Sequence, residues 1–155
     1  MSSRPSGPTR PVVTVVVAHD RPLVRLGSAA VLHTAPGVVV LGAAADGVEL
    51  LGLLAETQPH VVVLDLRLPL LDGVAVTVAV RARYPGSRVL LLTDGDEEED
   101  GLLEALRAGA SGYVLGDVEP AALVEAVRVV AAGSLIVGAA LRNRLLSGTA
   151  NRSFA

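Results

Sequence analysis

The sequence of 155 residues contains no cysteine, and this absence excludes disulfide frameworks, thiolate chemistry and cysteine-based metal sites. It also fits a cytoplasmic protein, which is the location we expect. Aromatic residues make up only 2% of the chain, so a packed core must consist mainly of valine, leucine and alanine. The length is sufficient for one domain with its own hydrophobic core.

Lysine is also absent, because all 13 basic residues are arginine. The net charge of −3 argues against a nucleic-acid-binding surface in this part of the protein. No apolar run approaches the ~20 residues of a membrane span, so we expect no contact with a membrane. The apolar stretch at 12–18 is too short for a signal peptide and runs into His19-Asp20, which is no cleavage site, so it predicts a strand.

What the sequence does contain is a regular alternation of apolar strand patterns and helix patterns. The run Val61–Leu64 is apolar throughout and indicates a strand buried on both faces. The predicted strands are 12–18, 38–41, 61–65, 89–92 and 112–115, and the predicted helices are 22–33, 46–56, 72–84, 97–108 and 120–132. This alternation predicts an α/β fold with a doubly wound, five-stranded parallel sheet in the order 2-1-3-4-5.

The same pattern divides the chain into three segments. Residues 1–11 are rich in serine, proline, glycine and arginine and predict a disordered leader. Residues 12–133 contain all the predicted strands and form the predicted domain. Residues 134–155 predict a linker or tail, in which the apolar residues between Ala139 and Leu146 suggest one short helix.

Polar side chains follow three of the predicted strands. His19-Asp20, Asp65 and Thr93 come directly at the ends of apolar runs, and ligands bind beyond the carboxyl ends of strands in open parallel sheets. Strands 1 and 3 are neighbours in the predicted order, so Asp20 and Asp65 should lie side by side. Such a carboxylate pair can hold Mg²⁺, and a metal beside a carboxylate lets that carboxylate accept a phosphoryl group.

Three segments at these positions resemble the receiver domain of two-component response regulators. Residues 65–73 resemble the phosphoacceptor loop of that family, residues 18–25 are similar to its first acidic loop, and residues 108–113 resemble the segment that enters its last strand. The resemblance covers about residues 12–133 and implies a flavodoxin-like, CheY-like fold. The subclass resembles regulators with a LuxR-type helix-turn-helix output domain, whose linker is similar to 141–146.

The resemblance also implies roles for individual residues. Asp65 would be the phosphoacceptor, Thr93 the switch hydroxyl and Tyr113 the switch aromatic. The metal ligands would be Asp20, Asp65 and the backbone carbonyl of Arg67, with His19 in place of an acidic residue. Receivers of this family act with a sensor histidine kinase. We also expect a homodimer, and DNA binding through a C-terminal output domain that is missing from this sequence.

Several positions depart from the family pattern. The family has two adjacent acidic residues where this chain has His19-Asp20, and it has a lysine where this chain has Gly116. The segment from Thr93 to Gly109 is one residue longer than in the family, so either the loop after Thr93 is lengthened or Asp94 takes the place of the hydroxyl. We therefore predict an atypical receiver in which Mg²⁺ binding and aspartyl phosphorylation are weak or absent.

Two other functions remain open. One is a pseudo-receiver controlled by a small ligand or a partner at the pocket edge rather than by phosphate. The other is a phosphohydrolase of the haloacid dehalogenase type, which also places an aspartate after an apolar strand. That family requires a second aspartate two residues later, where this chain has Arg67, and we therefore expect no enzymatic function.

Overall fold

The computed structural model describes residues 11–94 and 99–154, with side chains described up to residue 147. Five parallel strands form one sheet in the order β2-β1-β3-β4-β5, which confirms the predicted fold and strand order. The strands are β1 (Val13–Ala18), β2 (Val38–Ala44), β3 (Val61–Asp65), β4 (Arg88–Thr93) and β5 (Gly112–Leu115).

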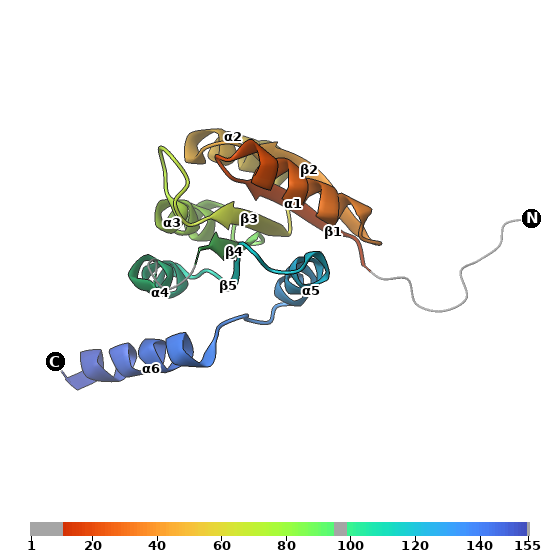
Figure 1. Ribbon diagram of the computed structural model, residues 1–155. Helices are drawn as coiled ribbons and strands as arrows, with labels where there is room; N and C mark the ends of the chain where they lie inside the picture. The colour runs from red at the N-terminus through yellow and green to blue at the C-terminus, as the bar shows by residue number, and fades with distance from the viewer. Residues whose placement is uncertain (1–10, 95–98, 155) are drawn as a thin grey trace, which may run out of the picture.

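Six helices lie along the described part of the chain: α1 (Pro22–Thr34), α2 (Gly47–Thr57), α3 (Gly73–Arg83), α4 (Glu99–Ala108), α5 (Pro120–Ala131) and α6 (Ala139–Phe154). Helices α1 and α5 cover one face of the sheet, and α2, α3 and α4 cover the other (Figure 1). The predicted leader up to residue 10 and the predicted helix start at 97 lie outside the described residues. None of the helices described has the length and apolar character of a membrane span.

The core lies on both faces of the central strands. Residues Val61–Leu64 of β3 are fully buried, as their unbroken apolar run predicts. In β1, Val15 and Val17 pack under α1 and α5, whereas Val16 and Ala18 pack on the opposite face, because successive side chains of a strand alternate. Burying each valine or leucine fully contributes roughly 1.5–3 kcal/mol, so these strands hold the polar strand ends in fixed positions.

Two helices begin where aspartates in the sequence predict a start. The Asp46 side chain accepts a hydrogen bond from Glu49 N at 2.7 Å, and the Glu49 side chain accepts one from Ala45 N at 3.3 Å. The Asp72 side chain accepts a hydrogen bond from Ala75 N at 2.9 Å. These bonds satisfy backbone donors that have no partner within the helix, and they fix the starts of α2 and α3.

Strand β2 is longer than predicted. The predicted strand ends at Leu41, but pairing with β1 continues from Gly42 to Ala44, which lies opposite Ala18. The glycine and alanines in this stretch weaken the strand pattern in the sequence. Their small size is needed here, because an ideal Cβ at Gly42 would lie 3.0 Å from a methyl carbon of Leu53 in α2.

Helix α6 is also longer than the short helix predicted, and the segment before it follows the edge of the sheet. Ile136 forms a parallel bridge with Gly112, and Ile136 N donates a hydrogen bond to Ser111 O at 2.9 Å. Leu141 is buried, and α6 lies beside α4 (Figure 1). The domain boundary at residue 133 stays a prediction, although residues 134–138 pack on β5.

Candidate functional site

The polar strand ends meet at the carboxyl edge of the sheet. His19 and Asp20 follow β1, Asp65 ends β3 and Thr93 ends β4. The register places Ala18 beside Leu64 and Asp65 beside Leu92, so the residues that follow are neighbours across adjacent strands. Buried apolar residues precede each polar residue and anchor it from within the core.

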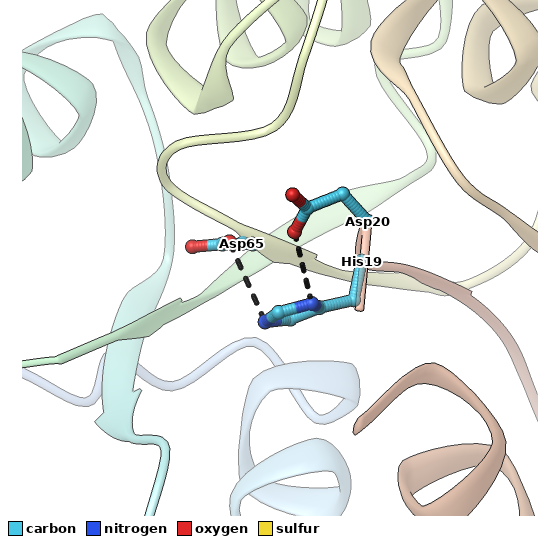
Figure 2. A group of neighbouring side chains, drawn as sticks. All are labelled: His19, Asp20 and Asp65. Carbon is cyan, nitrogen blue, oxygen red and sulfur yellow. Dashed lines mark ion pairs between the residues drawn. The ribbon is translucent and has the colours of Figure 1, made fainter. Parts of the chain in front are cut away.

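His19 lies between the two carboxylates, as Figure 2 shows. Its Nε2 lies 3.4 Å from an oxygen of Asp65, and its Nδ1 lies 3.4 Å from an oxygen of Asp20. The ligand atoms of His19, Asp20 and Asp65 all lie within 4.8 Å of one another. His19 is 8% exposed, whereas the side chains of Asp65 and Asp20 are 15% and 47% exposed.

The hydrogen bonds around His19 indicate which ring nitrogen carries the proton. Arg21 N donates a hydrogen bond to Nδ1 at 3.0 Å, so Nδ1 must present a lone pair. The proton then belongs on Nε2, which faces Asp65. The ring N–H of His19 is therefore directed toward Asp65, and Nδ1 accepts from Arg21 N and only contacts Asp20.

Two further bonds hold the loop after β1 in place. The Arg25 guanidinium donates a hydrogen bond to His19 O at 2.6 Å and lies 3.5 Å from Asp20 O. Arg25 is in the first turns of α1, so the helix and the acidic loop are fastened together. The position of Asp20 therefore depends on α1 as well as on β1.

Both oxygens of Asp65 are engaged. One oxygen accepts a hydrogen bond from Arg67 N at 3.2 Å, and the other faces His19. The Asp65 carbonyl also accepts a hydrogen bond from Leu68 N at 3.2 Å, which turns the chain directly after β3. The side chain of Arg67 is exposed, and the role of its carbonyl as a metal ligand stays a prediction.

A pocket of about 230 Å³ opens beside Asp65. Its lining brings together residues from the loop after β1, from α1, β3 and β4, and from the loops after β4 and β5, namely His19, Arg21, Val24, Asp65, Leu92, Thr93, Asp94, Gly116 and Asp117. Thr93 is 2% exposed and is one of the residues that line this pocket. The predicted alternative, Asp94, lies in the same lining, and the choice between the two stays open.

Tyr113 lies apart from this pocket. It is half-buried, and its hydroxyl accepts a hydrogen bond from Gly138 N at 3.2 Å. An ideal Cβ at Gly138 would lie 2.7 Å from that hydroxyl, so a larger residue at 138 would push the ring away. The predicted switch aromatic thus contacts the segment that leads into α6, and its role in switching stays a prediction.

The pocket also contains residues that the sequence did not single out. Arg21 and Asp117 lie in the lining, and each is exposed. Arg21 comes from the start of α1 and Asp117 from the loop after β5, so only the fold brings them to Asp65. The one available signal is their position directly after motif residues, since Arg21 follows His19-Asp20 and Asp117 follows Gly116.

The donor atoms present fit a divalent cation in part. Asp20 and Asp65 supply carboxylate oxygens, which are the ligands that Mg²⁺ prefers. His19 supplies a nitrogen, and its N–H side faces Asp65, so it competes with a cation for that carboxylate. The arrangement therefore offers a divalent cation fewer anionic ligands than a site with three carboxylates.

Comparison with known proteins places this site in a family. The model of the response regulator receiver domain family matches residues 15–128. The nitrate/nitrite response regulator NarL of Escherichia coli K12 is 31% identical over 128 residues, which cover 83% of this chain and 59% of NarL. The chain thus spans about 60% of the length of the curated relatives that it matches.

Solved structures agree with this match. A receiver domain named NarL from Mycobacterium tuberculosis is 39% identical, with a TM-score of 0.75 over 80% of this chain and 99% of that one. A two-component response regulator of the LuxR family from Aurantimonas sp. SI85-9A1 is 32% identical, with a TM-score of 0.77 over 90% of this chain and 99% of that one. The chain therefore belongs to the response regulator receiver domain family, and its relatives are transcriptional regulators of the NarL and LuxR type.

Proposed function

We propose that this chain is the signal-input domain of a two-component regulator of transcription, and that Asp65 is a phosphoacceptor with weakened phosphorylation. The observation that carries the proposal is the set of charges around Asp65. Gly116 lines the pocket where the family has a lysine, and His19 lies where it has an acidic residue. The acceptor carboxylate is present, whereas two of the groups that support its chemistry are not.

In the proposed reaction, an Asp65 oxygen attacks the phosphorus of a phosphoryl donor. The new oxygen–phosphorus bond forms as the bond to the leaving group breaks, and the leaving group departs with the electron pair. Mg²⁺, held by Asp20, Asp65 and the carbonyl of Arg67, would offset the developing negative charge. One Asp65 oxygen already accepts the Arg67 N–H and the other faces His19, so phosphorylation must disturb one of these contacts.

The missing lysine limits what a phosphoryl group can do. A hydrogen bond to a charged group contributes about 1.5–3 kcal/mol, and such bonds to the phosphoryl group stabilise the active conformation. Thr93 can donate its hydroxyl hydrogen to a phosphoryl oxygen, but that bond carries no positive charge. We therefore propose that the active conformation is set largely by dimerisation or by a ligand at the pocket edge.

The proposed partners follow from the family. A sensor histidine kinase would supply the phosphoryl group, and an output domain beyond this chain would bind DNA. The regulator would act in the cytoplasm as a homodimer. Tyr113 would change its position with the state of Asp65, and its bond to Gly138 would pass that change to α6.

A pseudo-receiver that responds only to a ligand or partner is the second candidate. The contacts of His19 with Asp20 and Asp65 favour the pseudo-receiver, because both carboxylates already have His19 as a neighbour. In this case the pocket lined by Arg21, Thr93 and Gly116 would receive the ligand. Asp65 would then serve to hold His19 rather than to accept phosphate.

One experiment separates these functions. The natural chain and Asp65→Asn are incubated with acetyl phosphate and Mg²⁺, and the covalent phosphate is quantified by mass spectrometry. We expect labelling of the natural chain well below one phosphate per molecule and none of Asp65→Asn. In the full-length regulator, Asp65→Asn should retain most promoter output and receiver self-association. Stoichiometric labelling, together with loss of both outputs in the variant, would establish phosphate as the signal and refute weakened control.

A further inference from the structure

The charges that line the Asp65 pocket are unequal in number. Asp65, Asp94 and Asp117 supply carboxylates, while Arg21 is the arginine in the lining. An anion that enters this pocket meets repulsion from these acids, so a cation nearby determines whether it is held. Arg21 is therefore the residue whose contacts matter most for a phosphoryl group on Asp65.

Arg25 has a partner in this region, whereas the Arg21 guanidinium has none among the residues that the structure describes. Arg25 donates to the carbonyl of His19 at 2.6 Å, which commits it to holding the loop. The side chain of Arg21 forms no hydrogen bond or ion pair with any residue that the structure describes. It is exposed at the pocket, so its head group can reach an incoming anion without giving up a bond.

The backbone of Arg21 is held firmly although its side chain is not. Its N–H donates to His19 Nδ1 at 3.0 Å, and its carbonyl accepts a hydrogen bond from Arg25 N at 3.0 Å at the start of α1. Pro22 follows and restricts the chain at the first helical position. The long side chain therefore pivots from a fixed point beside Asp65.

We propose that Arg21 binds the phosphoryl group on Asp65 and takes over the role of the lysine that the family has at the position of Gly116. This inference rests on the proposed function, since it requires Asp65 to accept phosphate. A guanidinium suits this task because its planar array of N–H groups can bind two phosphate oxygens at once. Residual phosphorylation of this receiver would then depend on the first turn of α1 rather than on the loop after β5.

A lysine introduced at position 116 tests directly whether Arg21 performs the role of the family's lysine. An ideal Cβ at Gly116 would lie 3.5 Å from Asp94 Oδ1 and 3.9 Å from Thr93 O, which is ordinary contact. The Cβ of a lysine at 116 is therefore accommodated without moving the backbone. The test variants are Arg21→Gln, Gly116→Lys and the double variant. The control is Arg83→Gln, which removes the same charge from an exposed position at the end of α3.

The readout is the initial rate of labelling by acetyl phosphate with Mg²⁺, followed by intact-mass spectrometry. We expect Arg21→Gln to label about tenfold more slowly than the natural chain, because a charge-assisted hydrogen bond is lost. Arg83→Gln should label at the natural rate, and Gly116→Lys should restore labelling in the Arg21→Gln background. Arg21→Lys should give an intermediate rate, since it keeps the charge but loses the planar array.

Two negative results have different meanings. If the natural chain is labelled and Arg21→Gln is labelled at the same rate, the assignment of Arg21 is wrong while the proposed acceptor stands. If neither the natural chain nor the Gly116→Lys variant is labelled, then Asp65 is not a phosphoacceptor and the assignment of Arg21 fails with it. Thermal unfolding midpoints measured beside these rates should be equal for Arg21→Gln and Arg83→Gln, because both side chains are exposed.

Discussion

A hollow of about 530 Å³ lies at the N-terminal edge of the sheet, whereas the pocket beside Asp65 at the carboxyl edge has about 230 Å³. The larger hollow is lined by the start of β1, the turn before β2 and the end of α5, and its polar members include His60, Glu125 and Arg128. The smaller pocket is lined by Asp65, Thr93 and their neighbours. The larger hollow is therefore not the one that contains the predicted site residues.

The polar groups at the two edges differ in their partners. At the N-terminal edge, His60 Nδ1 accepts a hydrogen bond from Thr14 N at 3.0 Å, and Arg128 donates to Pro36 O at 2.6 Å. The first bond joins a loop to β1, and the second joins α5 to the turn before β2. At the carboxyl edge, like charges gather around Asp65 instead, and the Arg21 guanidinium has no partner among the described residues. The comparison indicates that a cluster of like-charged side chains, which repel one another, is a better marker of a candidate functional site than the volume of a cavity.

The largest effect we expect at the carboxyl edge comes from His19→Asp. A third carboxylate beside Asp20 and Asp65 should tighten Mg²⁺ binding about tenfold, because oxygen ligands and negative charge favour this ion. Without Mg²⁺ the variant should be less stable, since the carboxylates repel one another. Isothermal titration calorimetry measures the affinity, with His33→Asp on the exposed side of α1 as the control. Tight Mg²⁺ binding by the natural chain would contradict the weak site.

A smaller effect, on stability alone, is expected at the N-terminal edge. Thr14→Val removes the hydroxyl that accepts a hydrogen bond from His60 N at 3.0 Å. The free energy of unfolding should fall by about 1 kcal/mol, while Mg²⁺ affinity and labelling of Asp65 stay unchanged. Urea denaturation checks the stability, and Thr34→Val, which removes a hydroxyl that donates to Val31 O within α1, is the comparison for loss of a local bond. A change in Mg²⁺ affinity would show that the two edges are coupled.

The smallest effect should come from Arg144 on α6, whose partners Glu99 and Asp100 begin α4. Its side chain donates to Glu99 at 2.6 Å and to Asp100 at 3.2 Å, and the hydrogen bond to Glu99, followed by that to Asp100, raises the pKa of Arg144 above its usual value. A raised pKa means that this contribution is present at every pH below the usual value for arginine and is lost only as the pH rises through the folded value.

Arg144→Ala should therefore change the thermal midpoint little at neutral pH, because the guanidinium is exposed and screened by water and salt. Any difference from the natural chain should vanish at high ionic strength. Arg142→Ala, an exposed arginine on the same helix, is the control. A large loss of stability at low ionic strength that disappears in high salt would mean that α6 is held on α4 by this ion pair rather than by Leu141.

Local patterns in the sequence determined the elements and the main residues of the site. The bounds of β3 and β5 match the predicted ranges, because each is a short apolar run ended by turn residues. The alternation of strands and helices was enough for the strand order, since right-handed crossovers leave few arrangements. That order in turn brings Asp20 and Asp65 to one edge. The roles of Asp65, Thr93 and Tyr113 stay predictions.

Only the tertiary structure decided which side chains share the pocket. Arg21 and Asp117 are 96 positions apart in the sequence yet line the same space, and no local pattern connects them. The bond of Tyr113 to Gly138 and the extra length of β2 likewise depend on segments that approach from elsewhere in the fold. The physical reason is that periodicity records which face of an element is buried, whereas a contact between polar side chains depends on how the packed elements place them.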